Sequence, residues 1–455
     1  MSADAQLVPT GTTEVPRRRR VSGSTRVVGT ALFVGLATAL VLSLVVFPGA
    51  TEGVITGSML VGFGIGWALM ATLSTRLTDR PQRWAAVPAV AMTGTGLSLM
   101  IAAPANGTLT ALTWVWPPAL LALVVWMAVQ VRRSLSGFGR WLVVPVLVFL
   151  GVASVGAVVQ NVTTMRDEDA FPPPGKVYSV GDHRLHLNCR GEGGPTVVLI
   201  GGIGGMSDSW ANVTAQLDSG TRVCAYDRAG QAWSDDVSSP QDGIAAATDL
   251  HRLLEAAGEQ GPFVLVGHSI GGPYAMVYAS RYPDQVAGMV LLDSSSPHQF
   301  AAMPAYPTQY AGLRRMYSVL PALVRMGAGG LVATGPGYPD EVADRLRAMS
   351  STPRAARNLR DEIAGVPTLF EQAQALTTLG DLPLVVVTAS ESRANTDGWA
   401  AAQDEIAGLS INATHVEVHS SHQGLVGDEA AAAESAHAIE EAVEAVANGG
   451  ARVGS

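Results

Sequence analysis

The chain has 455 residues, which is long for a single domain, and only 15% of them are charged, against about a quarter in an average soluble protein. Its net charge of −9 is divided unevenly, because residues 1–160 hold 11 Lys and Arg against 4 Asp and Glu, whereas the remainder holds 18 against 34. The acidic part would repel nucleic-acid phosphates, and two cysteines are too few for a zinc cluster, so we expect neither nucleic acid nor a metal as partner.

The N-terminal part is predicted to be a membrane domain. Residues 1–25 are rich in Ser, Thr, Pro and Arg and have no apolar period, which predicts a disordered tail. Five uncharged apolar stretches of roughly 20 residues follow, the length that a helix needs to cross a bilayer. They are Val27–Phe47, Gly53–Ser74, Trp84–Ala103, Leu109–Val131 and Trp141–Val159. Residues 26–160 therefore predict a transmembrane domain of five helices.

The loops between these stretches predict an orientation. Arginines lie before the first stretch and in every second loop, and the alternate loops, Pro48–Glu52 and Pro104–Thr108, have no Lys or Arg. The basic positions are Arg17–Arg20, Arg26, Arg76, Arg80, Arg83, Arg132, Arg133 and Arg140. The positive-inside rule then places the N-terminus in the cytoplasm and the chain after the fifth span outside it.

The spans contain no Asp, Glu, Lys, Arg or His. The polar groups expected along an ion pathway are therefore missing, and the spans favour an anchor over a transporter. Residues 161–175 carry three acidic residues and then three prolines, a composition that predicts a stiff, solvated linker.

From Lys176 to about Ala447, short apolar strands alternate with helical stretches, which indicates an α/β sheet. One of these strands runs from Phe263 into Gly267-His268-Ser269-Ile270-Gly271, and a helix follows. The pattern G-x-S-x-G between a strand and a helix is a nucleophile elbow, in which a side chain at either flanking glycine would clash. Ser269 is therefore the candidate nucleophile.

Residues 176–447 resemble the α/β-hydrolase superfamily. Motifs agree in chain order: a glycine-rich turn, Gly201-Gly202-Ile203-Gly204-Gly205, then Asp227-Arg228-Ala229-Gly230, the elbow, and a late histidine. The resemblance implies a mostly parallel hydrolase sheet with a helical cap, here preceded by the all-α transmembrane domain. It also implies an oxyanion hole made by the backbone N–H groups of Ile203 and Ile270, and no cofactor. The glycine-rich turn lacks the G-x-G-x-x-G spacing of a dinucleotide site.

The general base and the acid should follow the last strands. His422 stands at the loop position of the family's catalytic histidine, and His268 is expected to support packing. For the acid we predict Asp293, which directly ends the apolar run Met289–Leu292, over Asp397 or Glu391. The later loop, where relatives also carry the acid, has Ser392 at the expected position. The alternative role for Asp293 is to cap the following turn.

Two further expectations concern the same half. Residues 297–380 separate two core strands by a length rarely left without structure, which predicts a helical cap. Cys189 and Cys224 are expected to form a disulfide, because the resemblance places their strands side by side and the orientation exports this half.

These features predict a membrane-anchored serine hydrolase that cleaves an ester or related acyl substrate, small or lipid-like, through a Ser–His–Asp triad and an acyl-enzyme. An aminopeptidase-like acyl hydrolase is one alternative. A non-catalytic binding or signalling protein with a hydrolase-like domain is another, against which the intact set of Ser269, His422 and oxyanion glycines argues. Substrate identity and oligomeric state stay open.

Overall fold

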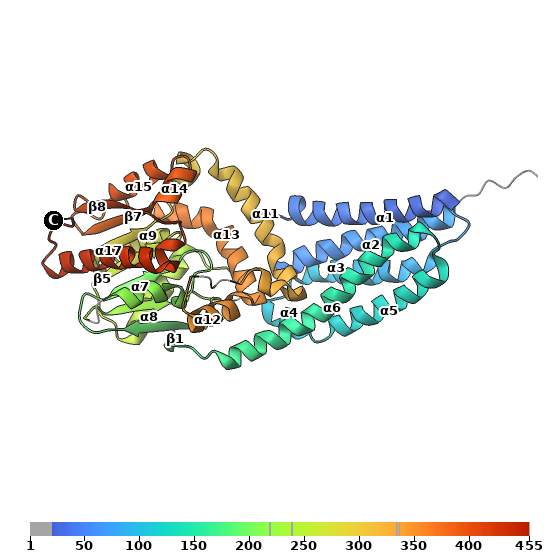
Figure 1. The fold of residues 1–455 in the computed structure, drawn as a ribbon, viewed down its shortest axis with the longest axis horizontal. Helices are drawn as coiled ribbons and strands as arrows, with labels where there is room; N and C mark the ends of the chain where they lie inside the picture. Colours follow the sequence, from blue (N-terminus) through green and yellow to red (C-terminus); the bar gives the residue numbers. More distant parts are fainter. Residues whose placement is uncertain (1–20, 218–219, 238–239, 334, 336, 455) are drawn as a thin grey trace, which may run out of the picture.

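A computed structural model describes residues 21–217, 220–237, 240–333, 335 and 337–454, and divides them into two parts. A bundle of long helices forms one end of an elongated molecule, and an α/β unit that carries the C-terminus forms the other (Figure 1). The α/β-hydrolase sheet and the preceding helical region both agree with the predicted fold class.

The helical part contains six α-helices. They are α1 (Val21–Val41, continued by η1, Leu42–Val46), α2 (Glu52–Leu77), α3 (Ala86–Ala102, preceded by η2, Arg83–Ala85), α4 (Asn106–Leu112), α5 (Trp116–Ser134) and α6 (Phe138–Ala170). Four helices are long and apolar enough to cross a membrane, or five if the pair of α4 and α5, bent by 47°, counts as one span. The predicted fourth span is therefore broken, at the residues before Trp116-Pro117-Pro118, where a proline pair cannot continue the hydrogen bonds of a preceding helix.

Two boundaries differ from those expected. Helix α1 begins at Val21, inside the predicted disordered tail, whose residues 1–20 lie outside the described residues. Helix α6 continues through most of the predicted linker and ends at Ala170, so only Phe171–Gly175 connects the two parts. The acidic run at 167–169 had indicated a spacer, but its residues form the last turns of an uninterrupted helix.

The C-terminal part is built on an eight-stranded sheet of order β1-β2-β4-β3-β5-β6-β7-β8. Strand β2 pairs antiparallel with β1 and β4, and the other pairs are parallel. The strands are β1 (Lys176–Ser179), β2 (Arg184–Arg190), β3 (Val197–Ile200), β4 (Val223–Tyr226), β5 (Phe263–His268), β6 (Val286–Leu292), β7 (Leu384–Ala389) and β8 (Ala413–Val418). Strands β3 to β7 are buried along their whole length, as the uninterrupted apolar runs predicted.

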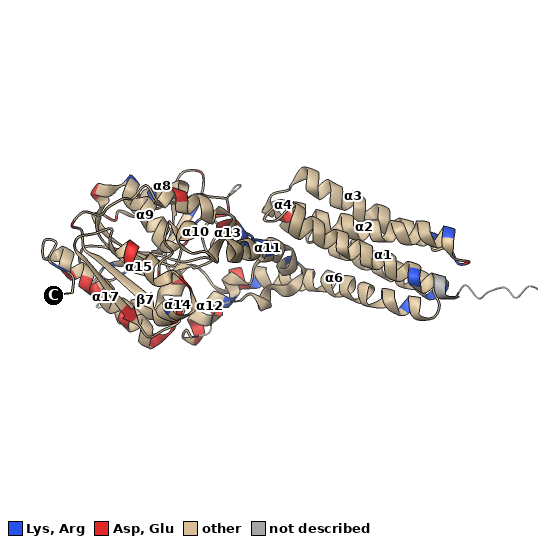
Figure 2. Ribbon diagram, turned by 90° about the horizontal axis from the view of Figure 1, so that it is seen from above, with Lys and Arg blue, Asp and Glu red and all other residues tan. Residues whose placement is uncertain are grey.

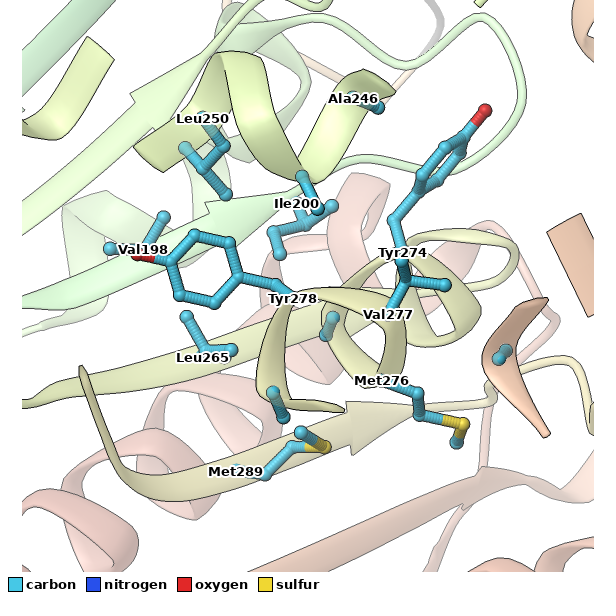
Figure 3. Close-up of a cluster of buried hydrophobic side chains, with 14 of the residues drawn as sticks. Val198, Ile200, Ala246, Leu250, Leu265, Tyr274, Met276, Val277, Tyr278 and Met289 are labelled. Atoms are coloured by element: carbon cyan, nitrogen blue, oxygen red, sulfur yellow. The ribbon is translucent and has the colours of Figure 1, made fainter. Parts of the chain in front are cut away.

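Helices cover both faces of this sheet. On one face, α8 (Gly243–Ala257), α9 (Gly271–Arg281) and α15 (Trp399–Ala407) share a core with the strands (Figure 3). On the other face, η3 (Ser207–Trp210), α7 (Ala211–Gln216), α16 (Gly424–Gly427) and α17 (Glu429–Ala447) pack in a second core. The fully buried Tyr278 of α9 points between Val198 and Leu265 of the central strands. This packing fixes α9, and with it the turn that precedes the helix.

The chain between β6 and β7 folds into helices, as expected for the cap. They are α10 (Gln299–Ala302), α11 (Tyr306–Leu323), η5 (Val324–Ala328), η6 (Gly329–Leu331), α12 (Asp340–Ser350) and α13 (Pro353–Ala373). Helix α13 packs on α8 and α9, whereas α11 lies against α2 and η1 of the helical bundle (Figure 1). The cap therefore touches both parts of the molecule.

An ion pair joins the cap to the bundle. The guanidinium of Arg325, in η5, contacts both carboxylate oxygens of Glu52 at 2.5 and 3.0 Å, and donates to Asn106 at 3.0 Å. Both charged side chains are more than nine-tenths buried. Glu52, expected in the loop before the second span, is instead the first residue of α2.

Charges divide along the long axis. Figure 2 shows Lys and Arg at the end of the bundle that faces away from the α/β part, and Asp and Glu over the α/β part itself. The arginine loops around Arg80, Arg132 and Arg140 thus lie at the opposite end of the bundle from the cap.

Candidate active site

Ser269 lies on the turn between β5 and α9, in the backbone conformation of an elbow. Its φ is +57°, a left-handed value that is strained for a residue with a side chain. A Cβ at Gly267 would lie 2.6 Å from the backbone of Gly271 and Gly272, and one at Gly271 would overlap Ile200. The prediction that both flanking positions require glycine is confirmed.

His422 lies in the turn after β8, and its Nδ1 is 2.6 Å from Oδ2 of Asp293, at the end of β6. A carboxylate there accepts the Nδ1 proton, which leaves Nε2 of His422 unprotonated and able to accept a proton. The two rejected acids, Asp397 and Glu391, are exposed, and neither contacts His422. The structure thus brings Asp293 and His422 together, as predicted, and the catalytic role of the pair stays a prediction.

The carboxylate of Asp293 is fully buried and surrounded by donors. Besides His422, it accepts hydrogen bonds from Nε1 of Trp399 at 2.8 Å, from the hydroxyl of Ser392, and from the N–H of Ala389 at 3.1 Å. Burial alone would raise the pKa of Asp293, but the hydrogen bonds from His422, Ser392 and Trp399 outweigh it and lower that pKa below its ordinary value. The group is therefore a stable anion, suited to stabilise an imidazolium.

His268 lies against His422 and is hydrogen-bonded to it. Its Nε2 donates to the backbone carbonyl of His422 at 2.9 Å, and the two rings lie 4.8 Å apart. Burial, and then the neighbouring His422, lower the pKa of His268 to about 3, so its ring is neutral at physiological pH. The expected packing role is consistent with this placement, and a role as the base is not.

The proposed oxyanion donors come from two turns, the elbow and the glycine-rich turn after β3. The N–H of Ile270 begins α9, and Ile203 lies in the turn that Gly202 and Gly205 close with a 3.0 Å backbone hydrogen bond. Within the described part of the chain, neither of the two isoleucine N–H groups has a hydrogen-bond acceptor. Gly202 passes so close that a Cβ there would lie 3.0 Å from Cβ of Ser269. Both N–H groups are therefore without an acceptor among the described residues, and their role as oxyanion donors stays a prediction.

A buried clamp holds the glycine-rich turn. Arg228 donates to the carbonyls of Gly201 and Gly202, each at 2.6 Å, and pairs with Glu362 of α13 at 2.7 Å. The other oxygen of Glu362 accepts the N–H of Gly204 at 2.7 Å. The cap thus fixes, through Glu362, the turn that carries Ile203.

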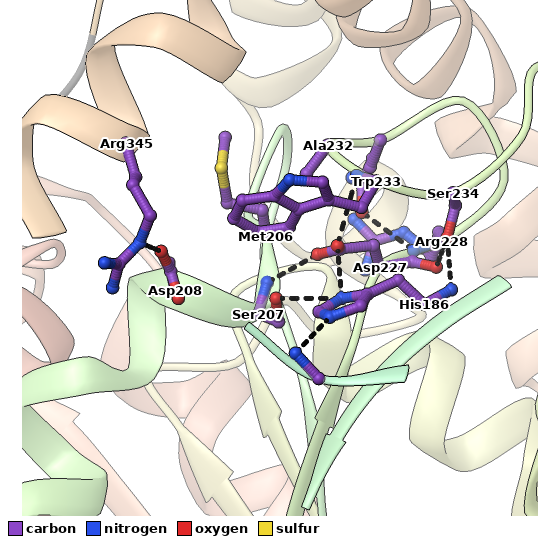
Figure 4. A network of polar contacts seen from close by, with 12 residues as sticks. His186, Met206, Ser207, Asp208, Asp227, Arg228, Ala232, Trp233, Ser234 and Arg345 are labelled. Atoms are coloured by element: carbon purple, nitrogen blue, oxygen red, sulfur yellow. Dashed lines mark hydrogen bonds and ion pairs between the residues drawn. The ribbon is translucent and has the colours of Figure 1, made fainter. Parts of the chain in front are cut away.

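A second polar network fixes the loops next to this turn (Figure 4). The fully buried His186 donates from Nδ1 to Asp227 at 2.8 Å, and Asp227 also accepts the N–H of Ser207 at 2.6 Å. Nε2 of His186 accepts the N–H of Gly175 at 3.1 Å, so the end of the interdomain connection is tied to β2. This pair holds loops and has no access to solvent.

No hydrogen bond joins the Ser269 hydroxyl to His422 among the described residues. Such bonds are often long before substrate binds. Ser269 is partly exposed, and the side chain of His422 is 31% exposed, so both are accessible. His419, the other histidine after β8, is exposed and lies 3.3 Å from Ser390, away from Asp293.

The predicted disulfide is present. Cys189 and Cys224 are directly opposite in the antiparallel pair of β2 and β4, and their sulfurs are bonded.

Sequence reasoning missed the roles of three residues that shape the site. Trp399 donates to Asp293, and Arg228 and Glu362 together clamp the glycine-rich turn. Trp399 and Glu362 come from α15 and from the cap, whose packing no local pattern predicts. Arg228 did carry a signal, because it belongs to the Asp-Arg-x-Gly motif that was recognised, but its partner could not be named.

Comparisons with known proteins agree with this geometry. Residues 195–320 match the family model described as alpha/beta hydrolase fold. An uncharacterised protein of Schizosaccharomyces pombe is 33% identical over 28% of this chain and 30% of its own length. The 2-hydroxy-6-oxo-6-phenylhexa-2,4-dienoate hydrolase of Comamonas testosteroni is 34% identical over 28% of this chain and 46% of its own. The chain spans between about a fifth and three fifths of the curated relatives that it matches.

A solved Nostoc structure described as an alpha/beta hydrolase superposes with a TM-score of 0.50 at 16% identity, over 58% of this chain and 96% of that one. That likeness concerns the fold. Together with the family model, the sheet order and the elbow, it shows that the C-terminal part of this chain has the α/β-hydrolase fold.

Proposed function

We propose that this protein is a membrane-anchored serine hydrolase that cleaves an ester or related acyl substrate through a covalent acyl-enzyme. The observation that carries the proposal is the hydrogen bond from His422 to Asp293, with His422 held against His268, the residue before the strained Ser269. The N–H groups of Ile203 and Ile270 have no acceptor among the described residues. Together these groups are a nucleophile, a base with its orienting acid, and an oxyanion site, the parts that acyl transfer requires.

The reaction follows from these positions. His422 Nε2 takes the proton of the Ser269 hydroxyl as its oxygen bonds to the substrate carbonyl carbon. The carbonyl oxygen becomes an oxyanion, which the N–H groups of Ile203 and Ile270 stabilise. His422 then returns the proton to the leaving group as the carbon–oxygen bond breaks, and water releases the acyl group in the reverse sequence.

The proposed anchor rests on the helical bundle, whose apolar helices have the required length. Large apolar side chains are exposed over its surface, and Phe33, Val90 and Ile101, at 71, 74 and 84% exposure, are examples. Such a surface would be unfavourable in water and suits lipid.

The test is labelling of the full chain with a fluorophosphonate probe, which reacts with activated serines. The wild type should be labelled, and Ser269→Ala should lose both labelling and turnover of p-nitrophenyl esters by several orders of magnitude. Ser280→Ala, on helix α9 that follows the elbow, is the matched control and should behave as the wild type. Unchanged turnover in Ser269→Ala would refute the proposal. If turnover is lost as expected, a panel of esters of increasing acyl length defines the substrate class.

A further inference from the structure

A groove of about 920 Å³ lies between helix α6 and the cap. One wall is a stripe along α6, and the other is formed by η5, η6 and α12. The α6 residues are Gly151, Val152, Val155, Gly156, Val159, Gln160, Thr163 and Asp167. The lining includes neither Ser269 nor His422, so the groove is separate from the proposed catalytic site.

The groove lies at the depth of the membrane surface. Helix α6 rises about 1.5 Å per residue, so a bilayer core of about 30 Å that begins at Trp141 would end near Gln160. Val152, Val155 and Val159 then lie within the half of the core nearer the α/β part, where they are 65, 54 and 58% exposed. In the proposed membrane, the apolar wall of the groove would therefore lie at the depth of the leaflet on the side of the α/β part.

The polar and charged side chains of α6 that line the groove begin at Gln160, at the end nearer the α/β part. Thr163 and Asp167 of α6 face Asp344 and Arg347 of α12, which form an ion pair at the rim. Two acids and one base give this end a formal charge of −1, which disfavours an anionic ligand and suits one that carries both an ammonium and a phosphate.

The walls are fixed, so the space is preformed. Gly156 packs directly against Gly327 at the base of the groove, where a Cβ on either residue would clash. Gln160 donates to the carbonyl of Ser351 at 3.0 Å and accepts the N–H of Gly329 at 3.3 Å. The volume lies in the range of sites that hold a small-molecule ligand.

From these observations we infer that the groove binds a zwitterionic bilayer phospholipid, with an acyl chain against the valines of α6 and the headgroup beside Asp167, Asp344 and Arg347. The cap residue Leu331, 88% exposed next to the groove-lining Gly330, would then lie in the same leaflet. The lipid would fill the space between the anchor and the cap.

The test uses the full chain in nanodiscs that contain equal amounts of phosphatidylethanolamine and phosphatidylglycerol, followed by transfer to a mild detergent and native mass spectrometry. The wild type should retain one phosphatidylethanolamine per chain. Gly151→Phe and Gly330→Phe should lose it, because both glycines line the groove and a Cβ added at either would have no protein atom within 4 Å. Gly94→Phe, at an equally open position on the apolar helix α3, is the matched control and should retain the lipid.

A photoreactive phosphatidylethanolamine with a diazirine in its acyl chain gives a second measurement. It should cross-link to α12 of the cap, around Ala348, as well as to α6. Lipid that merely surrounds the bundle would label only the helices of the bundle. Gly330 lies in the cap, so its variant decides the question if Gly151→Phe fails to fold.

Four outcomes would overturn the inference. They are no retained lipid in the wild type, retention in both groove variants equal to that in the wild type, a preference for phosphatidylglycerol, and a second copy of the chain in the groove. The inference rests on the proposed membrane anchor and does not depend on the proposed acyl transfer. Ser269→Ala should hold the lipid as the wild type does, so loss of labelling in that variant and loss of lipid in the groove variants are separate results.

Discussion

Asp293 holds a negative charge where water does not reach it, and the four donors around it supply what water would have supplied. One of them, Ser392, stands at the position where the acid itself was expected in the later loop. The two loops therefore share one task in this chain, because β6 provides the carboxylate and the loop after β7 provides hydrogen bonds to it. This arrangement keeps the acid on a rigid strand end.

Asp293→Asn should therefore leave the fold intact and lower turnover by up to about ten-thousandfold, because an amide would select the wrong tautomer of His422. Initial rates with a p-nitrophenyl ester, per mole of folded protein, give the comparison. Asp397→Asn is the control and should stay near the wild type. If the control shows the loss and Asp293→Asn does not, the acid belongs to the later loop.

Glu362 acts through other groups and is a positioning residue. Glu362→Gln removes the charge that holds Arg228, so the turn with Ile203 should loosen and kcat should fall by up to about a hundredfold, the typical loss for one oxyanion donor. KM should change much less, since the substrate's ground state does not need the oxyanion site.

The exposed Glu371 of the same helix provides the control variant Glu371→Gln, which should match the wild type. A melting temperature measured alongside separates positioning from folding. If Glu362→Gln lowers only the melting temperature, and kcat per folded molecule is unchanged, the clamp is merely structural.

For single residues, the sequence predicts the position of those whose place is set by local backbone geometry. The elbow at Ser269 and the strand end at Asp293 are examples, because a few neighbouring residues determine each. Trp399 and Glu362 depend on where α15 and α13 pack, and that is decided by the whole core. The pairing of Cys189 with Cys224 came from the sheet order that the resemblance supplied.

At the scale of elements, the cap is bonded both to the glycine-rich turn and to the helical bundle, unlike a lid that only covers a site. Its helix α13 reaches the glycine-rich turn through Glu362, and its segment η5 is tied to the start of α2 through Arg325 and Glu52. A buried ion pair contributes little by itself compared with apolar packing, but it strongly penalises any arrangement that separates the charges. The pair therefore fixes the position of the cap on the bundle.

Arg325→Met should destabilise the protein by about 3–5 kcal/mol, because it leaves the Glu52 carboxylate buried without a partner. Adding Glu52→Gln should restore part of that loss, and thermal unfolding of the single and double variants in one detergent measures the coupling. Arg393→Met breaks an exposed pair with Glu417 and should cost about 1 kcal/mol or less. Additive effects of the Arg325 and Glu52 changes would contradict the coupling.

Element boundaries were predictable where periodicity and breakers agree. The strands and the closing helix of the α/β part follow their apolar patterns, and the expected helix at 429–447 is found as α17. The end of α6 was not predictable, because its last turns carry charges typical of a solvated linker. They stay helical since an unbroken helix continues its own hydrogen bonds, and Gln160 ties it to the cap.

For the whole molecule, the bundle serves as a platform for the cap, in addition to the anchoring role proposed for it. The bundle presents a broad end surface formed by η1, α2, α4 and α6, and the cap touches each of these elements or lies against it. A single span would offer no such surface. The cap, the groove and the glycine-rich turn are thus held in one arrangement relative to the membrane.

The orientation of that platform is the last prediction. Arginines gather at the end of the bundle that faces away from the α/β part, which by the positive-inside rule should be the cytoplasmic end. Alkaline phosphatase, active only outside the cytoplasm, should then be active when fused after Gly175. A fusion after Ser136, in an arginine-flanked loop at the other end, should be silent. Green fluorescent protein at the same two sites should give the opposite pattern. Phosphatase activity only after Ser136 would reverse the topology, and it would also place the Cys189–Cys224 disulfide in a reducing compartment, where such bonds are rare.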